Sequence, residues 1–567
     1  MFCFLLVSMT LSVTSSAQTV ENLTKIHSKS SLSPKKVAKL GDHVYTFMSF
    51  NNEDSLFIDN QLQSNVLKSI NTDPLLNNTT LIVSKFDLTH KLKKTVSLSG
   101  SYVNLQTHDG KIYVFIVDYY PIVKYNGEEI WTATKKHGWG DSWNVMVVLD
   151  EDLQLLDVKG IDHYNAGFDG IAFGEDRMYL SGNFTNTTEA VETIEVDGYK
   201  IVGLGKDRGI QTTFMLTYDT HTGKIIECER FNVNHFTLYT GSQSLLVGVD
   251  GSVYQLLMTS FTYFIYEDIE FNAGQSNVLI KYTRDGKVEK IVNFFKDNYS
   301  FITEMKMTST GDLILYGECQ YGLGYNGVEM IKTHLPYAAV LMVLDEKDLS
   351  MKWYDYMATH KKVENGLTVR IGGMTIDNED NIYIMNSHGI ALTAVDKEGN
   401  TLRPGNHIYK YSKDGKRLGD FGSFAQFGEQ FLLFAKGVDT LFIMKGVGLT
   451  KGSYDSLLNI MNTYGREFAL FQFILNKTSG IDDVQKNEND RIYPNPVHKD
   501  GLLTISCDHS IVDKNYFISD AMGRIMGSGI IDNTRQIHLS SYNLNSGIYF
   551  IRMLDGVSPP IRFVIAD

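Results

Sequence analysis

The sequence DGKIYVF at residues 109–115 contains the pattern that decides the fold: a tight turn followed by a strand that begins with an apolar residue and an aromatic one. The same pattern occurs seven times, about 65 residues apart, and the slot that Tyr113 occupies is held in turn by Tyr45, Tyr113, Tyr179, Tyr254, Ile314, Tyr383 and Phe442. A fixed period over seven copies is typical of a repeat architecture.

A second pattern keeps the same period. In it an apolar strand ends at a polar turn, at Asp87, Asp150, Asp219, Thr283, Asp345, Ser412 and Asn476. With the flanking apolar runs, the two patterns predict four short antiparallel strands in each unit. We interpret the recurring aspartates as turn initiators rather than metal ligands.

Four-stranded sheets in tandem bury their faces against one another when they are arranged in a ring. We therefore predict an all-β fold: a seven-bladed β-propeller over residues 18–480, followed by a small C-terminal β-sandwich. The alternative for the repeats is a pair of β-sandwiches with accidental internal similarity. The outer strand of the last blade is expected from residues 20–27, unless that blade is incomplete.

Composition excludes some classes of partner. The chain of 567 residues has a formal net charge of −14 and lacks the basic footprint of a nucleic-acid-binding protein. Its four cysteines form no CxxC pair, so neither a zinc site nor a disulfide framework is expected, although one Cys228–Cys319 bridge is possible. We expect no metal and no cofactor.

The N-terminus has the pattern of a secretory signal. An apolar run from Phe2 to about Val13 is followed by small polar residues up to Ala17. We predict a signal peptide over residues 1–17; a membrane anchor is the alternative, but the run is shorter than the ~20 residues that span a bilayer.

The C-terminal part begins at RIYPNPV, residues 491–497, where two prolines enforce an extended backbone. Alternating apolar runs beyond it, separated by turn residues, predict a β-sandwich over residues 491–567. The Asn- and Asp-rich residues 481–490 before it are expected to be an exposed linker.

This C-terminal part closely resembles the type A C-terminal sorting domain of the type IX secretion system. The matching residues include Tyr493, Pro494, Asn495, Pro496, Asp520, Gly523, Arg524, Gly547, Tyr549 and Arg552. The resemblance implies a cargo that reaches the periplasm on a signal peptide and is then guided through the outer membrane by the secretion machinery. It also implies release into the medium, or attachment to surface lipopolysaccharide after the domain is cleaved off.

No catalytic motif is found in the sequence beside the sorting-domain resemblance. GxSxG, HExxH and phosphate-binding glycine loops are absent from the sequence. Whether the protein is an enzyme is therefore uncertain. We favour a binding protein for a glycan or a protein ligand over a lyase or hydrolase that acts on polysaccharide from a propeller scaffold.

The best candidates for ligand contact lie in one aromatic-rich stretch, residues 119–143. It contains Trp131, His137, Trp139 and Trp143. Exposed aromatic faces bind sugars and partner side chains, and the long second-to-third connections of all seven units are expected on one rim of the ring. The alternative is an internal hairpin that turns at Tyr125, Asn126 and Gly127, with the tryptophans packed on the blade.

Overall fold

The computed structural model describes residues 19–566 with internal gaps, and all structural statements below refer to the described residues. The gaps are 29–31, 52–55, 59–60, 63–78, 119–121, 134–142, 164–165, 187–190, 205–210, 235–241, 260–262, 267–268, 273–275, 295–299, 320–321, 327, 332–337, 360–369, 389–393, 403–404, 425–430, 436–439, 447–453, 456–459, 462–465, 475–490, 507–511, 513, 521–524, 543 and 554–560. Two compact units emerge: residues 18–475 form one, and residues 476–567 together with 1–17 form the other.

The strand pairings of the first unit form seven antiparallel sets of four strands, which we call blades 1 to 7. Blade 1 consists of β2 (Leu32–Leu40), β3 (His43–Asn51), β6 (Thr79–Asp87) and β7 (Leu92–Ser99). Blade 2 consists of β8 (Ser101–His108), β9 (Lys111–Asp118), β12 (Trp143–Asp150) and β13 (Leu155–Gly160). Blade 3 consists of β14 (Ala166–Phe173), β15 (Arg177–Thr185), β18 (Gln211–Asp219) and β19 (Ile225–Asn234). Each set contains one copy of both sequence patterns.

Blades 4 to 7 repeat this arrangement. Blade 4 consists of β20 (Ser242–Val247), β21 (Val253–Thr259), β24 (Ser276–Tyr282) and β25 (Val288–Asn293), and blade 5 of β26 (Ser300–Met307), β27 (Asp312–Cys319), β30 (Ala338–Asp345) and β31 (Met351–Thr359). Blade 6 consists of β32 (Arg370–Ile376), β33 (Ile382–His388), β36 (Gly405–Tyr411) and β37 (Arg417–Phe424). Blade 7 consists of β38 (Phe431–Ala435), β39 (Thr440–Gly446), β42 (Arg466–Ile474) and β1 (Thr19–Ser28).

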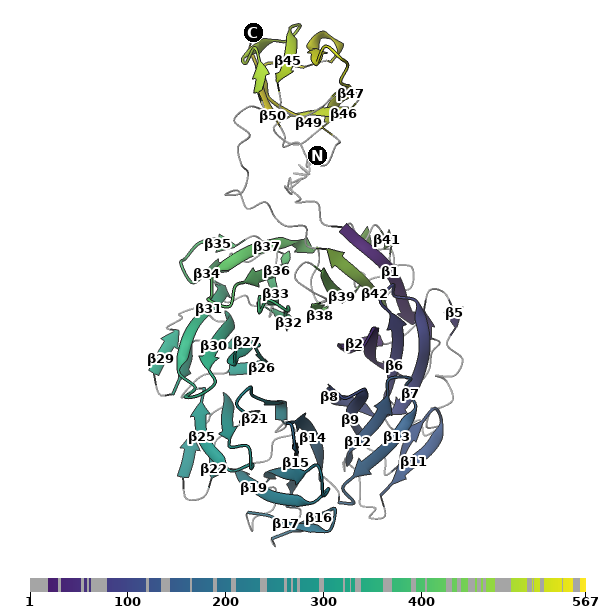
Figure 1. Cartoon of the computed structure of the whole chain (residues 1–567), viewed down its shortest axis with the longest axis vertical. Helices are drawn as coiled ribbons and strands as arrows, with labels where there is room; N and C mark the ends of the chain where they lie inside the picture. The colour runs from purple at the N-terminus through teal and green to yellow at the C-terminus, as the bar shows by residue number, and fades with distance from the viewer. Residues whose placement is uncertain are drawn as a thin grey trace, which may run out of the picture. The chain divides into compact units, whose positions relative to one another are not determined.

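The ring closes through both ends of the first unit. The N-terminal strand β1 pairs antiparallel with β42, from Thr19 opposite Ile474 to Ser28 opposite Arg466, and so supplies the outer strand of blade 7. The innermost strands of successive blades lie beside one another all the way round, with β38 again beside β2 (Figure 1). The predicted propeller architecture and the predicted source of its closing strand are thus confirmed.

The two sequence patterns meet across the interfaces between blades. The aromatic-slot residues Tyr45, Tyr179 and Tyr254 each donate a phenolic hydrogen bond to a backbone carbonyl in the next blade, at 2.6 to 2.7 Å. The acceptors are Glu151, Arg284 and Glu346, each one residue past a polar turn position of the second pattern. In these three blades the two patterns therefore meet at a contact between neighbouring blades, and each blade contains one copy of both patterns, so both share one period.

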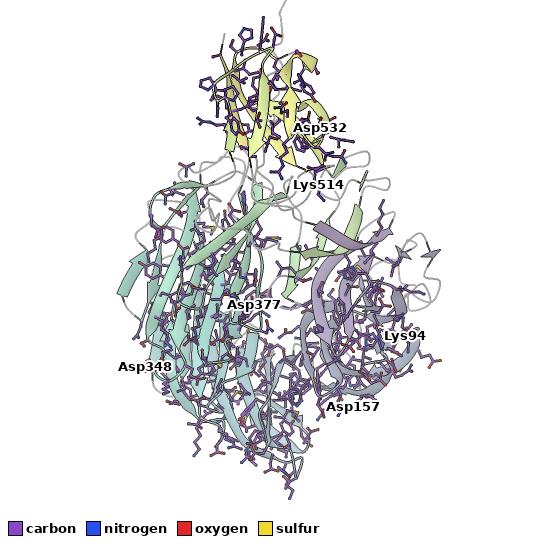
Figure 2. All side chains as sticks on the ribbon, turned by 45° about the horizontal axis from the view of Figure 1, so that its top comes forward. Lys94, Asp157, Asp348, Asp377, Lys514 and Asp532 are labelled. Atoms are coloured by element: carbon purple, nitrogen blue, oxygen red, sulfur yellow. The ribbon has the colours of Figure 1, made fainter. Side chains whose placement is uncertain are left out.

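The aspartates at the turns serve the backbone. The Asp150 carboxylate accepts hydrogen bonds from the amides of Asp152 and Gln154, and Asp219 caps its own turn in the same way. Asp377, labelled in Figure 2, accepts two amide hydrogen bonds within its turn and a third bond from the Tyr383 phenol at 2.9 Å. Their interpretation as turn initiators is confirmed.

The second unit is a β-sandwich. One sheet contains β43 (Arg491–Tyr493), β45 (Leu502–Ser506) and β48 (Gln536–His538); the other contains β44 (Val497–His498), β50 (Ile561–Ala566), β49 (Gly547–Met553), β46 (Asn515–Asp520) and β47 (Ile525–Ile530). Side chains of both sheets, among them Leu503, Ile518, Ile551 and Phe563, share one buried core. The predicted C-terminal sandwich is confirmed.

Two other expectations concern the cysteines and the N-terminus. Cys228 and Cys319 are free thiols, so the bridge that the sequence left open is not formed. The predicted signal peptide, residues 1–17, lies outside the described residues. Within the part of the chain that the structure describes, no helix has the length and apolar character needed to cross a bilayer.

Candidate functional site

The long second-to-third connections fold into short hairpins, which we call strap hairpins. They are β4–β5 (Leu56–Ile58, Gln61–Leu62), β10–β11 (Ile122–Tyr125, Glu128–Thr132), β16–β17 (Thr193–Val196, Tyr199–Val202), β22–β23 (Tyr263–Tyr266, Ile269–Asn272), β28–β29 (Leu323–Tyr325, Val328–Ile331), β34–β35 (Ala394–Asp396, Thr401–Leu402) and β40–β41 (Tyr454–Asp455, Ile460–Met461). Four of them pair with the outer strand of the preceding blade: β4 with β1, β10 with β7, β22 with β19 and β34 with β31.

Equivalent residues fix the strap hairpins of blades 2 and 5. At the tip of each hairpin a tyrosine, Tyr125 or Tyr325, donates to a leucine carbonyl in the third-to-fourth turn of its own blade. The following asparagine amide donates to the outer strand of the preceding blade, Asn126 to Ser97 at 2.9 Å and Asn326 to Asn293 at 3.3 Å. Each of these hairpins therefore joins two blades.

In blade 3 an aspartate takes over this role. Asp197 at the tip of β16–β17 forms a 2.6 Å ion pair with Lys159 of blade 2 and accepts a 2.8 Å hydrogen bond from the Tyr218 phenol of its own blade. The Lys159 ammonium and the Tyr218 hydrogen bond lower the pKa of the Asp197 carboxyl against the opposing effect of burial. The Val-Asp-Gly and Tyr-Asn-Gly turns thus occupy equivalent positions.

Two of the predicted ligand-binding residues are placed within this framework. Trp131, on β11, packs its indole on the backbone of Gly160 in β13, so closely that a Cβ atom at residue 160 would lie 2.5 Å from the ring. Trp143 is only 3% exposed and stands at the junction of blades 2 and 3, where it pairs with Asp118 on one side and Ala166 on the other. Trp143 is a core residue here, which corrects the expectation that it faces a ligand.

The other two predicted residues, His137 and Trp139, lie outside the described residues. The alternative for residues 119–143, an internal hairpin, is present, with Asn126 and Gly127 at its turn, both at positive φ. Trp131 is half-buried, so it remains a predicted ligand contact together with His137 and Trp139.

A group of charged side chains that the sequence analysis did not single out meets at the axis of the ring. The Lys36 ammonium of blade 1 lies 3.8 Å from the Glu304 carboxylate of blade 5, and these blades are not neighbours in the ring. Lys306 and Tyr102 lie within electrostatic range of the same carboxylate. We call Lys36, Tyr102, Glu304 and Lys306 the axial cluster.

The backbone explains why Lys36 and Glu304 reach each other. Register shifts mark a β-bulge in the innermost strand of six blades, and Lys36 and Glu304 each stand directly after that bulge in their own strands. The equivalent positions in blades 2, 3, 4 and 6 hold Asn104, Gly170, Ser244 and Gly373. Because those residues are short, the long side chains of Lys36 and Glu304 can extend across the axis; a bulge often re-aims a side chain in this way.

Burial governs the ionisation of the axial cluster. Desolvation lowers the pKa of Lys306, an effect that the nearby Lys36 charge reinforces and the Glu304 carboxylate opposes. Desolvation also raises the pKa of the Tyr102 phenol, with the Glu304 charge as a second cause. Tyr102 is therefore neutral at physiological pH and suited to donate a hydrogen bond rather than to accept a proton.

The sorting-domain residues form a second site. Asn495 binds the last strand with both ends of its side chain: its Oδ1 accepts the Val564 amide at 2.9 Å and its Nδ2 donates to the Arg562 carbonyl at 3.2 Å. The segment around Pro494 and Pro496 is exposed, and Tyr493 keeps 54% of its surface accessible. The Tyr-Pro-Asn-Pro segment thus does more than mark a boundary, because Asn495 fixes the C-terminal strand β50.

Other residues of the motif lie in the neighbouring strands. Tyr549, which follows Gly547 in β49, is 6% exposed, donates a 2.8 Å hydrogen bond to the Asn545 carbonyl and stacks on Phe563. In register, Asp520 stands opposite Tyr549 and Arg552 opposite Phe517. Gly523 and Arg524 lie outside the described residues.

Among the residues placed in the structure, no three His, Cys, Asp or Glu side chains are grouped as metal ligands.

Comparison with known families identifies the C-terminal unit. Residues 491–565 match the model of the secretion system C-terminal sorting domain, which confirms the resemblance seen in the sequence. A sorting domain of this kind implies interaction with the type IX secretion machinery and export to the cell surface or the medium. No curated protein matches the chain.

Solved structures offer distant likenesses. Acylaminoacyl peptidase of Pyrococcus horikoshii is 11% identical over 84% of this chain, with a TM-score of 0.37, and this chain covers 57% of its length. PorZ, a surface component of the type IX secretion system of Porphyromonas gingivalis, is 11% identical, with coverage of 96% of this chain and 100% of PorZ and a TM-score of 0.12. The polysaccharide lyase Uly1 is 8% identical, with coverage of 78% and 90% and a TM-score of 0.36.

Proposed function

We propose that this protein is an extracellular binding propeller, delivered by the type IX secretion system through its C-terminal sorting domain, that binds a glycan or a protein ligand. The observation on which the proposal rests is the sorting domain at residues 491–565, with Asn495 holding its last strand. Residues 18–480 are then the cargo, and their ligand is met outside the cell.

The proposal includes a route. Residues 1–17 act as a signal peptide for transfer to the periplasm, and residues 481–490 are the linker at which the sorting domain is removed. The mature cargo is released into the medium or attached to surface lipopolysaccharide. The acidic net charge of −14 supports a soluble exported protein rather than a partner of nucleic acid.

The roles of the recurring repeat positions favour binding over catalysis. The recurring tyrosines and aspartates form hydrogen bonds between blades and within turns, so they are committed to the fold. A polysaccharide lyase or hydrolase on the same scaffold is the alternative.

The test is an array of glycans and host proteins probed with the mature chain purified from culture medium. We expect saturable binding to one ligand class without chemical change of the ligand. Cleavage of a captured polysaccharide, seen as new reducing ends or unsaturated products, would favour the enzyme instead. A chain that captures no member of either class would contradict the proposed binding role.

A further inference from the structure

The axial cluster has more positive charge than its one carboxylate balances. Lys36 and Lys306 together face Glu304, and within the described part of the chain no other carboxylate lies within ion-pair distance of either lysine. This local excess stands out in a chain whose net charge is −14. A positive site in an acidic protein attracts anions specifically to that place.

A role in the stability of the fold does not explain why residue 306 is a lysine. Its ammonium is desolvated, and no carboxylate among the residues with described placement lies within ion-pair distance of it. A methionine of similar length would fill the same space with no charge to desolvate. Ionisable groups that are perturbed by burial and by specific neighbours gather at functional sites more often than elsewhere. The geometry agrees, because the cluster brings together side chains from blades 1, 2 and 5.

The cluster is also partly accessible. The Lys36 and Glu304 side chains are 36% and 23% exposed, and Tyr102 and Lys306 are half-buried, so each of the four residues keeps some surface in contact with solvent. Tyr102 adds an aromatic ring and a neutral phenol beside the charges. Cations next to an aromatic face and a hydrogen-bond donor are the groups that recognise a sugar carrying a carboxylate or a sulfate ester.

We propose that the axial cluster binds the anionic group of an acidic glycan, with Lys36 and Lys306 as its cationic contacts and Tyr102 as its aromatic one. Glu304 holds Lys36 across the axis in the free protein and limits the net charge there. This inference rests on the proposed binding function and names the ligand class of that function.

The experiment is titration calorimetry, at low ionic strength, of the protein without its predicted signal peptide, residues 18–567. The probes are an oligogalacturonate, a sulfated cello-oligosaccharide, which has sulfate esters and no carboxylate, and a neutral cello-oligosaccharide of equal length. The first two separate a carboxylate ligand from a sulfate ligand, and the third measures binding that needs no charge. A polyglutamate peptide serves as the fourth probe, because it carries carboxylates without sugar rings.

Four variants report on the site. Lys306→Met and Lys36→Met are expected to weaken binding of an acidic oligosaccharide by about ten- to a hundredfold, the loss expected for a hydrogen bond to a charged group. Glu304→Gln is expected to strengthen the same binding, because it removes the competing carboxylate. Lys111→Met is the matched control: Lys111 is an exposed lysine at the start of β9 in blade 2, and its loss should leave the affinity unchanged.

The opposite responses of the lysine and glutamate variants separate binding from a structural role, since damage to the ring would weaken binding in all three. The inference is overturned if neither acidic oligosaccharide binds, if Lys306→Met binds as tightly as the unaltered protein, or if polyglutamate alone shows the dependence on Lys306. A neutral glycan or a protein captured on the array with no effect of Lys306→Met would retain the proposed binding function and refute the anionic site.

Discussion

Trp139 and Trp143 are close in sequence, but we expect them to have different roles. Trp143 is buried where blades 2 and 3 meet, while Trp139, in the segment 134–142, remains a predicted ligand contact. We expect Trp143→Ala to destabilise the propeller by about 3–5 kcal/mol, as the loss of a buried aromatic does. Trp139→Ala should leave the melting temperature nearly unchanged and weaken ligand capture.

Thermal unfolding of both variants, with ligand capture measured in parallel, checks this contrast. Equal and small shifts in melting temperature for the two variants would show that Trp143 does not support the fold. A large destabilisation by Trp139→Ala would place Trp139 in the core and remove it from the binding surface.

Lys306 gives a prediction about pH. Burial lowers its pKa in the folded state below the ordinary value of 10.5, and its charged neighbours are Glu304, which raises the pKa, and Lys36, which lowers it. Where the pH lies below the lowered pKa, the residue is charged in both states and the folded state bears the desolvation cost. As pH rises through the lowered pKa toward 10.5, the folded state releases its proton first and the cost disappears.

Lys306→Met should therefore melt at a higher temperature than the unaltered protein at pH 7, and the difference should narrow as the pH approaches 10.5. Melting curves across this range provide the measurement. A variant that is less stable at pH 7 would mean that Lys306 stabilises the ring, and would weaken the argument that it is retained for binding.

Strap hairpins are the elements that join neighbouring blades. In blade 5 the Tyr325 phenol, 7% exposed, donates to the Leu349 carbonyl while Asn326 reaches the outer strand of blade 4. We expect Tyr325→Phe to cost about 1 kcal/mol, because it leaves a buried carbonyl without its donor. Tyr199→Phe, on an exposed position of the hairpin of blade 3, is the control that should cost little.

The measurement is the midpoint of chemical unfolding of the propeller. If Tyr325→Phe and Tyr199→Phe unfold at the same denaturant concentration, the hairpin contact contributes nothing to stability and the straps are better seen as surface loops.

Elements also show what could be predicted from the sequence. Tyr113 and Asp150 belong to two patterns of equal period, and this periodicity predicts the four-stranded blades. The closing strand near residues 20–27 is expected for another reason, namely that the seventh unit shows no fourth strand in its sequence; an incomplete last blade was the alternative, and β1 fills the position. The axial cluster was not predictable, since Lys36 and Glu304 are distant in sequence and meet only because equivalent bulges place them at the same position in two blades. Asn495 was recognised as part of a motif, but its hydrogen bonds to β50 depend on residues about seventy positions away.

At the scale of the whole molecule the chain consists of two units with separate cores. We predict that limited proteolysis cuts first between Gly480 and Asn489 and yields two resistant fragments, because each unit satisfies its own strand pairings without that segment. Mass spectrometry of the early fragments locates the cut. Early cleavage within the repeats, with residues 480–489 intact, would contradict the proposed domain boundary.

The central claim is that the C-terminal unit directs export of a propeller that folds without it. Its most direct test is fractionation of cells that produce either the full chain or a chain lacking residues 491–567. We predict that the full chain reaches the surface or the medium, whereas the shortened chain accumulates in the periplasm as a folded, protease-resistant propeller. Shortened protein found at the surface or in the medium in the same proportion as the full chain would contradict the claim.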